Sequence, residues 1–403
     1  DDSAHAAVRR LAAARFISLA GTDATAVAIG FALYEQTHSA RLLSFSFALT
    51  IGGAAVLSPF AGRAGDLFDR RRLMIGAELA AGTVFLTLAL IHTPAALLAL
   101  GFLAAATGTV FGPASGAAIA HVAGERHMAW ANGVISTGAN VGKTAGRLAA
   151  GILITVVSAA GVFLLNALTC VLSALLIRSV RRAFKAPLTE PAPEDRERPA
   201  PVPAGGVRFV LSNPTVKLVL ASACVSTFAT AFSMTAEVPL VFELGVGAIG
   251  LGALTACWGG GMVLGSWVAG RVLHRGNEAT GVLVGRLVMA AGVGLIAVSG
   301  SLWPMLTCYL LGGAGGGFMG VAAQSLVMRN TPDSLRARTL GAIETCRNVA
   351  FGLGVLGAGT LVGLMGARPV YALVGMVMTL GTIPVATLVF RLGGLRPLRA
   401  VPA

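Results

Sequence analysis

The sequence predicts an all-α integral membrane protein with twelve transmembrane helices in two bundles of six. Three observations predict this fold class: the composition, a series of long apolar stretches, and an internal repeat. Of the 403 residues, 55% are hydrophobic and only 12% are charged, whereas a soluble globular domain carries about 25% charged residues. Because so few charges cannot cover the surface of a water-soluble fold, the composition excludes a soluble enzyme, a soluble DNA-binding module and a disordered chain.

The apolar stretches are long enough to cross a bilayer, which takes about 20 residues of helix. They are continuous and do not alternate between apolar and polar residues, so helices are favoured over barrel strands. The expected spans are 11–35, 42–62, 72–92, 95–120, 129–157 and 160–179 in the first half, and 214–243, 247–270, 279–300, 303–328, 337–365 and 369–390 in the second.

The basic residues indicate how these spans are oriented, because cytoplasmic loops collect Lys and Arg. If the N-terminus is cytoplasmic, the opposite side of the membrane carries only Arg41 and Arg368. The cytoplasmic side then carries Arg9, Arg10, Arg15, Arg63, Arg70, Arg71, Arg72, Arg126, Arg271, Arg275, Arg329, Arg336, Arg338, Arg391, Arg396 and Arg399. Both termini are therefore predicted to be cytoplasmic in a multi-pass protein of the inner (plasma) membrane. Topology, rather than a nucleic-acid partner, explains the net charge of +13.

A hydrophilic segment divides the chain into two sets of six spans. Residues 187–206 combine many prolines with charges of both signs, a composition typical of an extended, largely disordered linker. We expect an N-terminal six-helix bundle at residues 1–180, a cytoplasmic linker at 181–213 and a C-terminal six-helix bundle at 214–403.

The two expected bundles resemble each other at a constant offset of 208 residues. Residues 61–63 (Ala-Gly-Arg) recur at 269–271, Gly133 recurs as Gly341, and Asn140 recurs as Asn348. With six spans in each copy, the copies have the same orientation in the membrane. A pseudo-twofold axis along the membrane normal therefore relates them.

The loop between the second and third spans, residues 61–74, reads AGRAGDLFDRRRLM. It resembles the corresponding loop of the major facilitator superfamily, whose pattern is roughly G-x-x-x-D-R-x-G-R-R. The matching residues are Gly62, Asp66, Arg70 and Arg71, whereas Leu67 and Asp69 depart from the pattern. The resemblance implies the major facilitator fold. It also assigns the matching residues to a conformational latch between the two halves, made of reversible charge-assisted hydrogen bonds. An ordinary positive-inside turn is the alternative, and Glu78 is expected to support the loop.

Within that superfamily the chain is similar to the branch that contains macrolide-efflux proteins and the enterobactin exporter, through segments such as 15–37 and 111–122. The fifth span departs from the exporter pattern G-x-x-x-G-P-x-x-G-G. Residues 138–147 read GANVGKTAGR, so that Lys143 replaces the Pro and Arg147 replaces the last Gly. The branch implies drug:proton antiport, and the two extra cations favour an anionic substrate.

Several ionisable side chains lie inside the predicted spans. Lys143 lies about 14 residues into its span, which is about 21 Å along the helix and near the middle of the membrane. A charge at that depth costs several kcal/mol unless it faces water, a partner or a substrate. The expected proton-coupling residues are Asp23, Glu237 and Glu344, and the expected substrate-binding residues are Asn140, Lys143, Arg147, Gln324 and Arg347.

Two interpretations of these charges remain open. In the first, Asp23 pairs with Lys143 or Arg147 and Glu344 pairs with Arg347, only to neutralise buried charge. In the second, Asp23 takes up and releases protons, because a partly desolvated carboxylate titrates near neutral pH, and the cations bind an anionic group on the substrate.

The sequence thus predicts a secondary active transporter that moves a small organic solute by alternating access. Proton-coupled efflux of an amphipathic drug or a siderophore-like metabolite is the first candidate function. Transport of an anionic or lysolipid-like solute through a cationic pocket is the alternative. No catalytic or metal-binding spacing is found, and the five cysteines are expected to be buried thiols. We expect no enzyme activity, no cofactor besides the proton gradient, membrane lipids as surroundings, and a monomer.

Overall fold

The computed structural model describes residues 2–67, 69–123, 128–180, 204–274, 276–332 and 335–391. These residues form helices, short turns and connections, with no strand among them. The chain divides into two compact units, Asp1–Ala192 and Pro193–Ala403. Each unit is described by itself.

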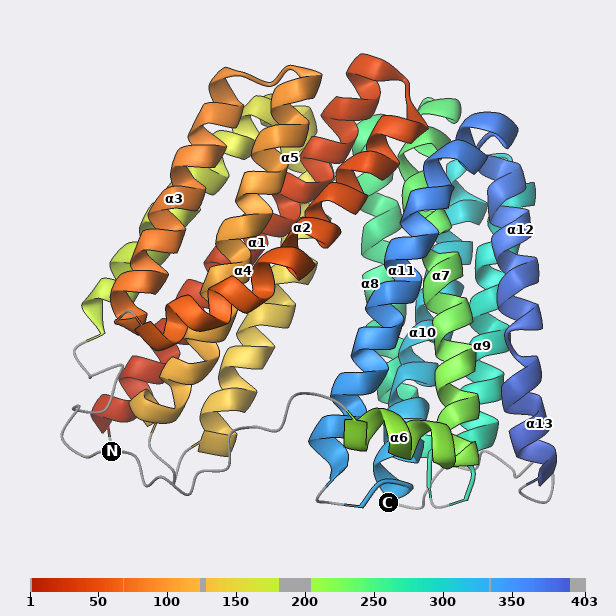
Figure 1. The fold of residues 1–403 in the computed structure, drawn as a ribbon. Coiled ribbons are helices and arrows are strands. Elements are labelled where there is room, and N and C mark those ends of the chain that lie inside the picture. Colours follow the sequence, from red (N-terminus) through yellow and green to blue (C-terminus); the bar gives the residue numbers. More distant parts are fainter. Residues whose placement is uncertain are drawn as a thin grey trace. The chain divides into compact units, whose positions relative to one another are not determined.

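The first unit begins with four helices and ends with a helical hairpin. Its elements are α1 (Asp2–Thr37), α2 (Ala40–Leu67), α3 (Arg70–Leu90), α4 (Pro94–Ala123) and α5 (Met128–Ser179). The hairpin is α5, which leaves helical geometry at Ser158, where φ is 62° and ψ is 171°. The two limbs of α5 correspond to the expected spans 129–157 and 160–179 (Figure 1, yellow to yellow-green).

The second unit repeats this plan with a short helix added at its start. Its elements are α6 (Ala204–Ser212), α7 (Pro214–Glu243), α8 (Gly247–Val272), α9 (Glu278–Leu295), the short 3-10 helix η2 (Ile296–Val298), α10 (Leu302–Arg329), α11 (Arg336–Met365), α12 (Ala367–Leu380) and α13 (Ile383–Arg391). The helix is interrupted between α12 and α13 at Gly381–Thr382. Those two helices together make up the last expected span.

Nine helices within the described ranges are long and apolar enough to cross a membrane. One of the nine, Gly133–Ser179, contains both limbs of α5, and α2 and α4 contribute the shorter apolar stretches Ala40–Gly53 and Pro94–Thr109. This arrangement fits the expected twelve crossings. The predicted all-α membrane fold is confirmed.

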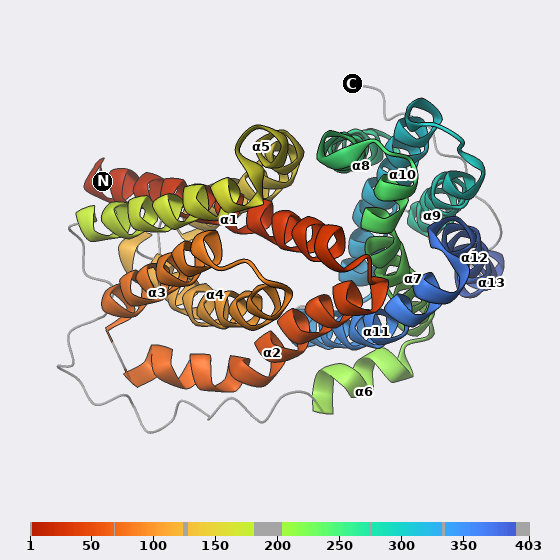
Figure 2. The ribbon, with the colours of Figure 1, turned by 90° about the horizontal axis from the view of Figure 1, so that it is seen from above.

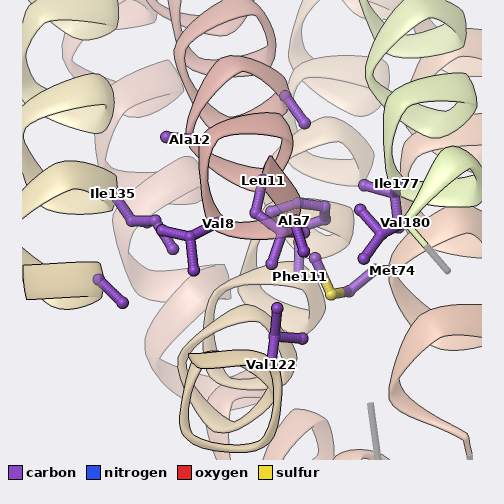
Figure 3. Packing of buried hydrophobic residues seen from close by; sticks show 12 residues of the cluster. Ala7, Val8, Leu11, Ala12, Met74, Phe111, Val122, Ile135, Ile177 and Val180 are labelled. Atoms are coloured by element: carbon purple, nitrogen blue, oxygen red, sulfur yellow. The ribbon is translucent and has the colours of Figure 1, made fainter. Parts of the chain in front are cut away.

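A hydrophobic core of the first unit lies around the N-terminal part of α1. Val8 and Leu11 of α1 meet Met74 of α3, Phe111 of α4 and Ile177 of α5 (Figure 3). These side chains are buried, so each helix of this cluster is held by apolar contacts with its neighbours rather than by surrounding lipid alone.

The close contact of α1 with α5 depends on glycine. A Cβ atom added to Gly142 or Gly146 would overlap the carbonyl oxygens of Phe16 and Ala20, respectively. In the second unit a Cβ added to Gly354 would meet the carbonyl oxygen of Phe228 in the same way. Gly354 and Phe228 lie 208 residues after Gly146 and Ala20. The internal repeat is therefore also a repeat of helix packing: small residues let the backbones of two helices touch.

The structure corrects the expected linker at its C-terminal end. Residues 204–212 form α6 instead of an extended chain. Val210 of α6 packs with Val216 of α7 and Ala342 of α11, and Figure 1 shows α6 lying across the ends of those two helices. The apolar residues of the segment GGVRFVLS (205–212) give it a side that buries, which a Pro-rich linker lacks. The N-terminal part of the expected linker, residues 181–203, lies outside the described residues.

Candidate transport site

The first unit contains an ion pair between α1 and the first limb of α5. The Arg147 Nε donates to the Asp23 Oδ1 at 2.7 Å. The Asp23 side chain is only 12% exposed, while the Arg147 side chain is 50% exposed. Asp23 is thus held inside the unit by a guanidinium that still reaches the surface of that unit. The structure selects Arg147, rather than Lys143, as the partner of Asp23.

Two other expected site residues lie on the same limb of α5. Asn140 and Lys143 are exposed on the surface of the first unit. Asn140 lies two turns and Lys143 one turn before Arg147, on one side of the helix. No described residue pairs with the Lys143 ammonium, so this cation is available to a ligand or to water.

The second unit brings together a smaller polar cluster at the repeat-related contact of α7 with α11. The Arg347 Nη1 lies 3.3 Å from the Glu344 Oε2, and the Arg347 Nε lies 3.4 Å from the Thr227 Oγ1. Both charged side chains are about half exposed or more. This pair is looser than the Asp23–Arg147 pair.

Glu237 and Gln324, also expected at the site, lie apart from that cluster. Gln324 is exposed on α10. Glu237 of α7 lies close enough to the phenols of Tyr309 and Tyr371 to interact with them electrostatically. The two phenol oxygens are 2.8 Å apart, and the Tyr371 hydroxyl donates to the Ser233 carbonyl at 3.1 Å. Sequence reasoning missed this buried tyrosine pair.

The expected latch is described only in part. Gly62 and Asp66 both fall in the last turns of α2, where the Asp66 side chain and the contacts of Gly62 are outside what the structure describes. Asp69, which departs from the family pattern, accepts from the Arg72 backbone N–H at 2.9 Å and caps α3. The Arg71 guanidinium donates to the Arg178 carbonyl at the end of α5. Arg70 begins α3, and its latch role stays a prediction.

Two further buried charges lie at repeat-related positions. Glu78, which was expected to support the loop, is 3% exposed and accepts from the Ser173 hydroxyl of α5 at 2.9 Å. Arg286 of α9 is 2% exposed and donates to the Ser222 carbonyl at 2.5 Å and to the Ser226 hydroxyl. The two residues are 208 positions apart, so the repeat places opposite charges at one packing position. Aligning the two halves would have revealed Arg286.

Arg286 is expected to stabilise the second unit, both by filling space and by its hydrogen bonds to α7. Arg286→Ala should lower the free energy of unfolding by about 3 kcal/mol, because it leaves a cavity. Arg286→Met should cost less than about 1 kcal/mol, because a buried charge is often replaced by an apolar side chain without loss. Thermal unfolding of the purified variants measures both. Equal losses in the two variants would show that the guanidinium bonds, rather than the volume, carry the stability.

Membrane-length helices in two repeat-related units, with an ion pair inside one of them, define a multi-pass membrane protein built like a secondary transporter. The family model of the Major Facilitator Superfamily matches residues 11–355 and 220–401. The chain belongs to the Major Facilitator Superfamily. It is accordingly a transporter with a small-molecule substrate and not an enzyme.

The relatives point to the same branch as the sequence motifs. The chain is 25% identical over 360 residues to the MFS-type transporter YfiS of Bacillus subtilis (strain 168), covering 86% of this chain and 84% of the relative. It is 25% identical over 367 residues to the enterobactin exporter EntS of Shigella boydii serotype 4 (strain Sb227), covering 88% of this chain and 85% of the relative. The expected similarity to the enterobactin-exporter branch is confirmed.

Solved structures agree on the fold. A bacterial homolog of the human lysosomal transporter Spinster matches with a TM-score of 0.70 at 14% identity, covering 94% of both chains. The nucleoside transporter NupG matches with a TM-score of 0.73 at 11% identity, covering 94% of this chain and 98% of that chain. The major facilitator fold is thereby confirmed.

Proposed function

We propose that this protein is a proton-coupled exporter of an amphipathic compound, such as a drug or a siderophore-like metabolite. The Asp23–Arg147 ion pair carries the proposal. It places a carboxylate inside a membrane-spanning helix and against one cation, where proton uptake and pairing exclude each other. The similarity to the enterobactin exporter supports export as the direction.

The pair allows two coupling schemes with opposite dependence on pH. A cationic or hydroxyl-bearing substrate that replaces Arg147 at the Asp23 carboxylate competes with the proton, which is the behaviour an antiporter needs. An anionic substrate that takes Arg147 binds best once Asp23 is protonated and has released the guanidinium. In the first scheme the affinity of the protein for its substrate rises with pH, and in the second scheme that affinity falls with pH.

The second scheme belongs to the alternative function, transport of an anionic or lysolipid-like solute. The observation that favours it is Lys143, which is exposed and has no partner among the described residues. Together with Arg147, Lys143 would offer an anionic headgroup two cations on one side of α5.

A binding measurement separates the two schemes. We suggest thermal-shift titrations of the purified protein with tetraphenylphosphonium as the cation, lysophosphatidylglycerol as the anion, and enterobactin, each at pH 6 and pH 8. Export by antiport predicts that the transported ligand raises the unfolding temperature of the protein more at pH 8 than at pH 6. Lys143→Ala is expected to weaken an anion about tenfold, the effect of losing about 1.4 kcal/mol, whereas Lys217→Ala, an exposed lysine at the start of α7, should change nothing. Unchanged anion binding in Lys143→Ala would contradict the cationic pocket.

We also propose the setting in which this transport takes place. The bias of basic residues supports cytoplasmic termini in the inner membrane. The latch residues Gly62, Asp66, Arg70 and Arg71 would hold one conformational state. The proton gradient is the proposed driving force, with Glu237 and Glu344 as further proton sites and Asn140, Gln324 and Arg347 as further substrate contacts. No cofactor is required, and a monomer suffices.

A further inference from the structure

The first unit has a groove of about 420 Å³ between α1 and the two limbs of α5. Small residues of α1 and the first limb form its floor, including Ala20, Ala24 and Ala149. Leucines of the second limb form its wall: Leu165, Leu168 and Leu172. Those leucines are 40%, 58% and 47% exposed, respectively, so the groove is open along the outer side of that limb.

The polar groups in the groove are already bonded to one another. The Asn166 side-chain amide donates to the Thr25 hydroxyl at 2.9 Å, and the Thr169 hydroxyl lies 2.9 Å from the Asn166 Oδ1. Asn166 is 1% exposed, and the lining contains no charged residue. The groove therefore offers apolar contact and no charge to an occupant.

The repeat shows how the chain fills the equivalent position in the second unit. The residues 208 positions after Ala20 and Ala24 are Phe228 and Phe232, whose ring centroids lie 5.2 Å apart. The counterpart of Ala149 is Gly357, and the Phe232 ring comes within 3.5 Å of a Cβ atom added there. In the second unit the Phe232 ring, with the partly exposed Phe228 ring beside it, thus lies at the position that two alanines leave open in the first.

The place and length of the groove indicate what fills it. Its lining lies within the membrane-length stretches His5–Thr37 and Gly133–Ser179, where the surroundings are hydrocarbon. From Val162 to Leu172 the wall extends about 15 Å along the helix, the length of a lipid tail rather than of a compact solute. An empty apolar groove of this size would forfeit the contacts that a hydrocarbon chain provides. Figure 2 shows α1 with both limbs of α5 beside it.

We propose that this groove binds an acyl chain of a membrane phospholipid. The occupant replaces in the first unit the packing that Phe228 and Phe232 supply in the second. The lipid is a bound component of the α1–α5 contact that carries Asp23 and Arg147, and it is not the transported substrate. The inference stands whether or not the protein couples transport to protons.

Photo-cross-linking tests the site directly. The full-length protein is reconstituted with phosphatidylcholine that carries a diazirine on one acyl chain, irradiated, and mapped by mass spectrometry. Wild type should be labelled on 20–24 and 162–172 above other lipid-facing segments such as the exposed face of α8. Ala24→Phe copies the second unit and should reduce that labelling at least about tenfold, as expected when about two methylene groups lose their burial. Ala26→Phe, at an exposed position on the same helix, is the matched control and should leave it unchanged.

The reciprocal variant keeps the proposal testable if Ala24→Phe does not fold. Phe232→Ala removes one ring from the second unit and should raise the labelling of α12 above the wild-type level. Labelling spread evenly over all lipid-facing segments in wild type would overturn the proposal. So would equal labelling of 162–172 in Ala24→Phe and Ala26→Phe, or no increase in the labelling of α12 in Phe232→Ala.

Discussion

Asp23→Asn is expected to abolish transport driven by a pH gradient while leaving the protein folded. The asparagine amide has the shape of the carboxylate and still accepts from the Arg147 Nε, which lies 2.7 Å away in the wild type, but it cannot carry a proton. Because the Arg147 side chain is 50% exposed, it tolerates the loss of its counter-charge. Solute uptake into proteoliposomes under an imposed pH gradient should fall to the rate measured without a gradient.

The control for Asp23→Asn is a second paired carboxylate. Glu243 at the end of α7 lies 3.9 Å from the Arg368 guanidinium and is 40% exposed, so Glu243→Gln should retain gradient-driven uptake. Solute exchange without a gradient should survive in Asp23→Asn, which separates lost coupling from lost binding. If Asp23→Asn kept its response to the gradient, the ion pair would serve only to neutralise buried charge.

Gly146→Leu is expected to prevent the first unit from assembling. At this position the backbones of α5 and α1 are in contact, and a Cβ atom alone overlaps the Ala20 carbonyl oxygen. A leucine must therefore separate the two helices, at a cost above about 3 kcal/mol. Gly354→Leu should have the same effect at the repeat-related contact of α11 with α7, where the Phe228 carbonyl is the neighbour.

The comparison for the glycine variants is Gly133→Leu on the same helix, because nothing lies within 4 Å of its added Cβ atom. Size-exclusion chromatography of the solubilised proteins should give a sharp peak for wild type and Gly133→Leu, and aggregate for Gly146→Leu. A monodisperse Gly146→Leu protein with an unchanged unfolding temperature would mean that α1 and α5 are not packed as described.

Much of the fold could be predicted from the sequence, because membrane spans depend on local composition and length. The sequence could not decide which cation pairs with Asp23, because Lys143 and Arg147 lie one turn apart on the same helix. Only the distances in the folded protein distinguish them. Arg286 was overlooked although it lies in the middle of α9 (Glu278–Leu295), where the topology rule does not explain a basic residue. Its burial against Ser222 becomes visible only when helices pack.

The groove and α6 were beyond sequence reasoning for a different reason. The groove results from two small side chains, Ala20 and Ala24, where the other half has phenylalanine, and its existence follows only from the packing of three helical segments. The helix α6 is nine residues long and too short to be stable alone, so its stability comes from contacts of Val210 with α7 and α11. Such contacts cannot be read from composition.

The most direct test of the account is to follow protons and solute together. Wild-type protein is reconstituted into vesicles that contain a pH-sensitive dye, and the solute that stabilises the protein in the thermal-shift titrations is added outside. Antiport through the Asp23–Arg147 pair predicts that solute entry drives protons out and alkalinises the lumen, and that Asp23→Asn removes this signal. Solute entry with no change of luminal pH, or with the same change in Asp23→Asn, would contradict it.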